Sequence, residues 1–181
     1  MSLPRTPLLT ARLLLRPYEP ADAPAFFELL HRNRLRLAAS FPDRVAVVLE
    51  PADAEAQLLR FAADWQAGRF YVLGLWHRQT LAYLGDVCLM PQGQYAEIGY
   101  YLAHEAQGQG YAREALAAVC TFGFEAVKIT RLLVRCFADN AAGQAVALAT
   151  GFQLEKNTGR FAWFRDTLGG ISIRRYWRNA P

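Results

Sequence analysis

Apolar residues in this chain occur in two patterns, and each pattern predicts a different kind of element. Short apolar runs separated by turn residues predict strands over residues 70–76, 81–90 and 95–102. Because the connections between these three strands are short, we expect an antiparallel meander. A further apolar run predicts a strand over residues 131–137.

Between the third and the fourth of these strands the apolar residues recur at helical spacing. The helix is expected to begin at about Tyr111, and its apolar face comprises Ala112, Ala115, Leu116, Val119, Gly123 and Val127. A connection of this length joins parallel strands, so the strand over residues 131–137 should run parallel to that over residues 95–102.

The N-terminal third is expected to hold one strand and two helices. The strand covers residues 8–17 and ends at Pro17; Pro20 and Asp22 suit the first turn of the helix that follows. Phe26, Leu29 and Leu30 form the buried stripe of this helix. Residues 32–44, which are basic and include Pro42, are expected to form a helix end and a loop. A second helix covers residues 51–66, and Gly68 stops it.

The C-terminal part begins with a short helix, for which Asp139 or Asn140 can serve as N-cap. Gly151 ends this helix, with Phe152 as the hydrophobic residue beyond. The last strands are predicted over residues 152–154 and 169–176. The aromatic residues between them, Phe161, Trp163 and Phe164, are expected in the core or at a dimer surface, because no basic residues alternate with them as in a nucleic-acid-binding strand.

Length and composition are those of one globular domain. The chain has 181 residues, of which 53% are hydrophobic and 20% charged, so we expect a single domain over residues 1–181. The net charge of +4 favours an anionic ligand. Because Lys and Arg are scattered along the chain, nucleic acid is not expected as the main partner.

The cysteines and the N-terminus exclude two further classes. Cys88, Cys120 and Cys136 are widely separated and form no Cys-x-x-Cys pair, so neither a metal site nor a disulfide framework is expected. The chain starts without a signal-peptide pattern and has no apolar run long enough for a membrane span. We therefore expect a cytoplasmic protein with no membrane association.

The candidate chemistry lies in the turn Gln107-Gly108-Gln109-Gly110-Tyr111-Ala112, between a strand and a helix. A helix start leaves backbone N–H groups without partners and carries partial positive charge. Glycines allow a bulky phosphate to approach that backbone, so the turn is a candidate phosphate or diphosphate site. The alternative is that the glycines only make a tight turn.

Two other phosphate-binding patterns are absent from the sequence. There is no Gly-x-x-x-x-Gly-Lys-Ser/Thr run, which excludes the P-loop of nucleotide hydrolases. The dinucleotide pattern Gly-x-Gly-x-x-Gly also fails, because position 113 is Arg and the preceding strands form a meander.

The turn resembles the signature Gln/Arg-x-x-Gly-x-Gly/Ala of the GNAT superfamily of acyl-CoA-dependent N-acyltransferases, with Gln107, Gly110 and Ala112 at its defined positions. Residues 10–22 resemble the N-terminal strand and turn of the branch that acetylates ribosomal-protein N-termini, the ribosomal-protein-alanine (Rim-type) N-acetyltransferases. Residues 140–152 resemble its second motif. The resemblance covers most of the chain.

The resemblance implies a mixed, mostly antiparallel α+β fold, with helices flanking a sheet whose central parallel strand pair splays apart. It implies acetyl-CoA as cosubstrate, bound in that opening, and an amine acceptor that approaches under residues 32–44. Glu97 is the implied catalytic base, with His104 as runner-up; a solvated strand-edge role for Glu97 is the alternative. The implied cofactor-binding residues are Leu102, Gln107, Gly108, Gln109, Gly110, Tyr111, Ala112 and Asn140.

The chain departs from the family where a proton donor for the leaving thiolate is usual. Gly143 replaces a serine and Ala147 replaces a tyrosine. Three hypotheses follow: an N-acetyltransferase of protein N-termini, an acetyltransferase of a small amine such as a polyamine or an aminoglycoside, and a silent acyl-CoA-binding module. Under the first two, a bulky residue in place of Gly110 should abolish cofactor binding.

Overall fold

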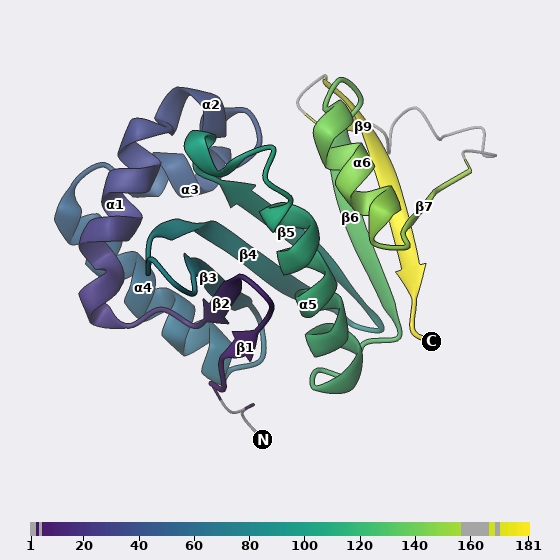
Figure 1. Ribbon diagram of the computed structural model, residues 1–181, viewed down its shortest axis with the longest axis horizontal. Helices are drawn as coiled ribbons and strands as arrows, with labels where there is room; N and C mark the ends of the chain where they lie inside the picture. The colour runs from purple at the N-terminus through teal and green to yellow at the C-terminus, as the bar shows by residue number, and fades with distance from the viewer. Residues whose placement is uncertain (1–2, 4, 157–166, 169–170) are drawn as a thin grey trace.

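A mixed sheet forms the centre of the protein (Figure 1), in a computed structural model that describes residues 3, 5–156, 167–168 and 171–181. The strands of the described part are β1 (Leu8–Leu9), β2 (Leu13–Arg16), β3 (Tyr71–His77), β4 (Tyr83–Gln92), β5 (Tyr95–Leu102), β6 (Arg131–Phe137), β7 (Gln153–Leu154), β8 (Thr167–Leu168) and β9 (Ile171–Asn179). Their order in the sheet is β1-β2-β3-β4-β5-β6-β9-β7, and β8 pairs with β9.

Pairing between neighbouring strands is antiparallel except between β5 and β6, which are parallel. The crossover between them is the helix α5 (Tyr111–Glu125). A crossover helix is the usual way to join adjacent parallel strands. The predicted meander and the predicted parallel pair are both confirmed.

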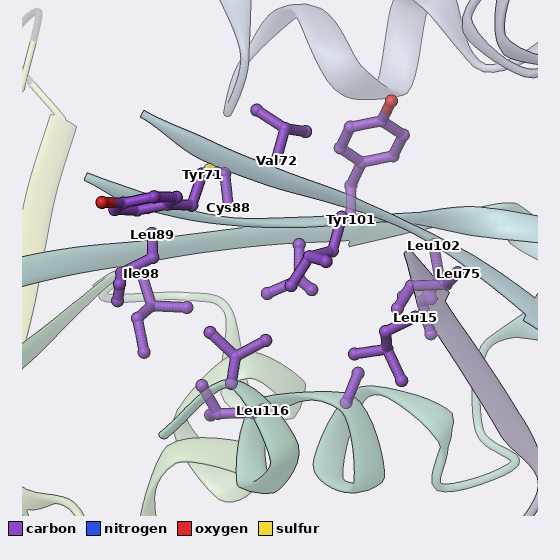
Figure 2. Packing of buried hydrophobic residues seen from close by; sticks show 14 of the residues in the cluster. Leu15, Tyr71, Val72, Leu75, Cys88, Leu89, Ile98, Tyr101, Leu102 and Leu116 are labelled. Atoms are coloured by element: carbon purple, nitrogen blue, oxygen red, sulfur yellow. The ribbon is translucent and has the colours of Figure 1, made fainter. Parts of the chain in front are cut away.

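Helices cover both faces of the sheet. The described helices are η1 (Pro20–Asp22), α1 (Ala23–Arg32), α2 (Arg34–Ala38), α3 (Pro42–Val47), α4 (Pro51–Gln66), η2 (His104–Ala106), α5 and α6 (Ala141–Ala149). Figure 2 shows Leu116 of α5 facing Leu89 and Ile98 of the sheet, whereas Tyr101 points to the opposite face. There its ring contacts that of Phe41 at a centroid distance of 5.2 Å. The stripe predicted for α1 is buried in this core, as are Ala115, Leu116, Val119 and Gly123 of α5. Ala112 and Val127, the ends of the predicted face, are only partly buried, and Val127 lies beyond the end of α5.

The prediction of one strand over residues 8–17 is wrong, because the chain turns back on itself within that range. β1 and β2 pair with each other antiparallel, with Leu8 opposite Leu15. Thr10 makes the turn: its N–H donates to the Leu13 carbonyl (3.0 Å), and its hydroxyl accepts from the Leu13 N–H (2.9 Å). A threonine hydroxyl that bonds the nearby backbone in this way favours a turn over a continuous strand.

The loop predicted over residues 32–44 is also wrong, since α2 and most of the first turn of α3 lie in it. Pro42 stands in the first turn of α3, where its missing N–H costs nothing, so it begins a helix here. The Arg34 guanidinium donates to the carbonyls of Val45 (2.7 Å) and Val48 and thereby ties α2 to the end of α3.

Two further boundaries differ from expectation. β4 continues through Pro91 to Gln92, with Pro91 opposite Ala96, so the hairpin turn lies at residues 93–94. β9 extends to Asn179. Phe161, Trp163 and Phe164 lie outside the described residues, and the single domain over residues 1–181 stays a prediction.

Candidate functional site

The turn before α5 contains two glycines in left-handed backbone conformations. Gly108 has a φ of 73° and Gly110, the N-cap of α5, has a φ of 82°. A side chain at such an angle is strained, which explains why glycine stands at both positions. A Cβ atom built on Gly108 would meet nothing within 4 Å. The turn is therefore open to a ligand on the Gly108 side.

The backbone N–H groups of residues 108–112 donate no hydrogen bond within the described part of the chain. Pairing is present at Gln107, whose N–H donates to the His104 carbonyl (3.2 Å), and resumes at Glu114, whose N–H donates to the Gly110 carbonyl (3.1 Å). Unpaired N–H groups at the start of a 15-residue helix, where the dipole is positive, are suited to an anion such as a diphosphate.

Arg12 fixes this turn from the opposite end of the sequence. Its guanidinium donates to the Gln109 carbonyl (2.9 Å) and the Glu114 carboxylate (2.8 Å), and it lies 4.6 Å from the centre of the Tyr111 ring. Glu114 also accepts from the Thr10 hydroxyl at 2.5 Å. Sequence reasoning placed Arg12 only in a strand, because its partners lie about a hundred residues away and leave no local pattern.

The strands β5 and β6 separate beside this turn, as the family resemblance implied. Their parallel pairing runs from Tyr95 opposite Arg131 to Ile98 opposite Val134 and stops there, although both strands continue (Figure 1). The Ala103 N–H donates to the Leu84 carbonyl of β4. Because backbone groups alternate along an antiparallel strand, those of Tyr100 and Leu102 point away from β4 toward the opening.

The Leu102 carbonyl is already occupied. It accepts a hydrogen bond of 2.6 Å from the guanidinium of Arg36, which also donates to the Asn33 side chain (2.9 Å). A ligand amide could therefore pair with the Leu102 N–H more readily than with its carbonyl. Arg36 had no signal in the sequence beyond its place in a basic segment.

A cavity of about 840 Å³ lies where β5 and β6 separate. Its walls come from α3 and the residues before it, from β4 to β6, and from the start of α6. Glu97 lines it, with only 11% of its side chain exposed, and its Oε1 accepts a 2.6 Å hydrogen bond from Arg135 Nε. The carboxylate is thus buried, paired and in contact with the cavity, so the strand-edge alternative for Glu97 does not fit its position.

Of the other residues predicted for the site, Asn140 lines the cavity, whereas Gln107, Gln109 and His104 are exposed outside its described lining. Asn140 lines the cavity and caps α6, its Oδ1 accepting from the Gly143 N–H at 2.9 Å. Gln107 and Gln109 are exposed in the turn, and the Gln109 side chain donates to the Glu105 carbonyl (2.8 Å). His104 is exposed in η2 and is not among the described residues that line the cavity, so the structure does not bring the runner-up base to it.

A buried polar cluster anchors α3 beside the cavity. The Asp86 carboxylate, 1% exposed, accepts hydrogen bonds from the hydroxyls of Tyr18 (3.0 Å) and Tyr101 (2.8 Å) and from Arg44 of α3. Tyr83 completes the cluster through its hydroxyl, 2.5 Å from that of Tyr18. Burial and then the negative charge of Asp86 raise the pKa of Tyr18, Tyr83 and Tyr101, so all three phenols stay protonated.

We expect Asp86→Asn to lower the free energy of unfolding by about 3 kcal/mol, because it leaves the Arg44 charge buried without its counterion. The matched control is Asp64→Asn, which breaks the more exposed pair with Arg69 and should cost less than about 1 kcal/mol. Urea unfolding followed by circular dichroism measures both. Equal effects of the two substitutions would show that α3 does not depend on this ion pair.

Neither a metal site nor a membrane helix is found in the described part of the chain. No group of three or more His, Cys, Asp or Glu side chains is placed there to hold a metal ion. None of its helices combines the length and the apolar character that crossing a membrane requires.

Comparison with known proteins identifies the family. Residues 12–153 match the family described as the acetyltransferase (GNAT) domain. The chain belongs to this family. The GNAT match covers the glycine turn, the diverging strands and Asn140, and it confirms the fold, the acetyltransferase class and acetyl-CoA as cosubstrate.

Individual relatives agree with this GNAT assignment. The uncharacterized N-acetyltransferase YoaA of Bacillus subtilis is 29% identical over 82% of this chain and 83% of its own. The ribosomal-protein-serine acetyltransferase of Escherichia coli is 38% identical, over 46% of each chain. A structure of RimL, a ribosomal L7/L12 alpha-N-protein acetyltransferase in complex with coenzyme A, has a TM-score of 0.80 at 22% identity and covers 96% of this chain and 98% of its own.

The geometry of this GNAT chain fits acetyl-CoA at both ends of the site. The unbonded amides of residues 108–112 suit the diphosphate, and the open backbone edge at Tyr100 and Leu102 suits the amides of the pantetheine arm. A thioester bound there supplies the activated acetyl group. The roles of the individual residues stay predictions.

This GNAT chain lacks the usual thiolate donors on α6. Gly143 lines the cavity and Ala147 is fully buried. Neither residue type has a hydroxyl that could donate to the thiolate. A Cβ at Gly143 would lie 2.8 Å from the Asn140 side chain. The cap of α6 therefore leaves little room for a serine at position 143.

Proposed function

We propose that this protein transfers the acetyl group of acetyl-CoA to the N-terminal amine of a protein, and that Glu97 accepts the proton of that amine. The observation that carries the proposal is the buried Glu97 carboxylate facing the cavity at the point where β5 and β6 separate. A base at that point lies beside the place where the thioester is expected.

The acceptor class follows from the demands of the chemistry. An amine attacks only when neutral, and an α-amino group has a reference pKa of about 7.7 to 8.0 against about 10.4 for lysine. An N-terminal amine thus needs only modest help from a base. Glu97 uses only one carboxylate oxygen in its bond with Arg135, so it retains a lone pair for a proton.

The relatives support the same acceptor class. Two of those described above are named for acetylating ribosomal proteins, one of them at the α-amino group of L7/L12. We therefore propose a protein N-terminus, that of a ribosomal protein first, as the acceptor for this chain. Cytoplasmic location and a homodimer stay predictions.

The test offers acetyl-CoA with two sets of acceptors and follows thiol release. One set holds peptides with a free N-terminal serine or alanine, each beside the same peptide blocked at its N-terminus. The other holds polyamines and aminoglycosides. Release with free peptides alone supports the proposal, and release with small amines alone would replace it. Tight acetyl-CoA binding without release to any acceptor would indicate the silent module.

A further inference from the structure

Tyr100 carries a hydroxyl that is buried beside the cavity and has no hydrogen-bond partner. Its oxygen is enclosed, and no donor or acceptor in the described part of the chain bonds it. Tyr100 nevertheless lines the cavity. Burying a hydroxyl without a partner costs folding free energy, so an orphaned hydroxyl on a residue that lines a cavity indicates a partner that arrives with a ligand.

The face of β5 on which Tyr100 lies is the face of the glycine turn. Figure 2 shows Ile98 and Leu102 on the α5 side of the sheet and Tyr101 on the other. Side chains alternate along a strand, so Tyr100 shares the α5 side and Glu97 points the opposite way. A cofactor whose diphosphate is bound at the start of α5 approaches from the side of Tyr100.

This arrangement matches the two requirements of acyl transfer. As the N–C bond forms, the C–S bond breaks and its electron pair stays on sulfur, while the amine proton passes to a base. Negative charge therefore develops on the cofactor side, and the proton is accepted on the acceptor side. Glu97 and Tyr100 line one cavity from opposite faces of one strand.

The other hydroxyl and thiol groups that line the cavity are weaker candidates than Tyr100, and the Cys88 thiol already donates to the Gly99 carbonyl (3.4 Å). Of the described residues that line the cavity, Ser40 and Tyr100 have hydroxyls, and Ser40 is exposed in the segment between α2 and α3. Cys136, which follows Val134 on β6 and so lies across the opening from Tyr100, is a thiol whose pKa burial raises to about 11. Thiols are weak hydrogen-bond donors compared with a phenol.

We propose that Tyr100 is a catalytic residue that donates a hydrogen bond to the departing thiolate sulfur and so replaces the donor missing from α6. This inference rests on the proposed function. Burial and the nearby Cys136 raise the pKa of Tyr100, so the phenol keeps its proton and acts as a hydrogen-bond donor rather than as an acid. The thiolate then takes its proton from water.

Tyr100→Phe tests the proposal because it removes only the hydroxyl. We expect kcat for acetyl transfer to fall about 30-fold, the value of one hydrogen bond to a charged group, with KM for acetyl-CoA changed less than about threefold. Tyr95→Phe is the matched control on the same strand; its hydroxyl bonds Gln92 outside the cavity lining, and the rate should stay at the wild-type value.

A second readout does not depend on turnover. The affinities of coenzyme A and of desulfo-coenzyme A are compared by calorimetry at pH 7 and at pH 9.5, where the thiol, with a reference pKa of about 8.5, is largely ionised. In the wild type the preference for coenzyme A should grow about tenfold at the higher pH, and Tyr100→Phe should abolish that growth. Thermal unfolding of Tyr100→Phe should occur at the wild-type temperature or above it.

Each outcome decides one question. A wild-type kcat in Tyr100→Phe, or a preference for coenzyme A that still grows with pH in that variant, would overturn the role of Tyr100. Loss of that growth in Cys136→Ala alone would assign the donor to the thiol instead. If the wild-type protein releases no thiol with any acceptor, the proposed function is refuted. The calorimetric comparison needs no acceptor, so it still tests the hydrogen bond from Tyr100 in that case.

Discussion

Replacing Gly108 by tryptophan is expected to weaken acetyl-CoA binding by about a thousand-fold, the loss of roughly two hydrogen bonds to a charged diphosphate. The Cβ of residue 108 points into open space, so the indole would occupy the volume over the free amides of residues 108–112 without displacing another part of the protein. Calorimetric titration with acetyl-CoA measures the effect. The Gly110→Trp variant should also lose binding, but its Cβ would lie 3.3 Å from Arg12, so its effect includes a shift of that clamp.

Gly93 provides a matched control for this experiment. It also has a positive φ, of 70°, and a Cβ built on it also meets nothing within 4 Å, but it lies in the turn between β4 and β5. Gly93→Trp therefore has the same backbone strain and the same exposed indole away from the start of α5. Wild-type affinity in Gly108→Trp, or equal losses in the two variants, would refute the diphosphate site.

The sequence was sufficient for the elements whose signal is local. α5 was predictable because its apolar residues recur at helical spacing and glycine precedes it, and the parallel direction of β6 followed from the length of that crossover. Asn140 and Gly151 fix the ends of α6 through interactions within a few residues, so their roles as caps were also predictable.

Features that depend on distant contacts were not predictable. The turn at Thr10 is held by Glu114, and the short helices α2 and α3 are held by the side chains of Arg34 and Arg44. In the sequence these arginines appear only as a basic segment with a proline. The charge of such a segment suggests solvent exposure, whereas Arg44 is in fact paired with Asp86 in the interior.

The candidate site shows the same division. The glycine turn and Glu97 were identified from their positions in a recognisable pattern. The Arg135 partner of Glu97, the Arg36 bond to Leu102 and the buried hydroxyl of Tyr100 became visible only in three dimensions. An unpaired hydroxyl in particular has no sequence signal, because it is defined by the absence of neighbours.

Glu97→Gln is expected to lower kcat for acetyl transfer by about a thousand-fold, within the range usual for removal of a general base. Glutamine keeps the shape of the side chain and a carbonyl oxygen for Arg135, but it cannot take up the amine proton. Steady-state kinetics with a free N-terminal peptide measures kcat, and calorimetry should show unchanged affinity for acetyl-CoA. Glu28→Gln, at an exposed position of α1, is the control and should leave kcat unchanged.

The pH profile separates a base from a structural partner of Arg135. If Glu97 accepts the proton, the loss in Glu97→Gln should shrink as the pH rises through the acceptor pKa of about 8, where the amine is already neutral. If Glu97 only holds Arg135 in place, Glu97→Gln and Arg135→Gln should lower the free energy of unfolding alike and reduce kcat by the same factor at every pH. A pH-independent loss shared by both variants would therefore remove Glu97 from the chemistry and leave the acceptor amine to lose its proton to water.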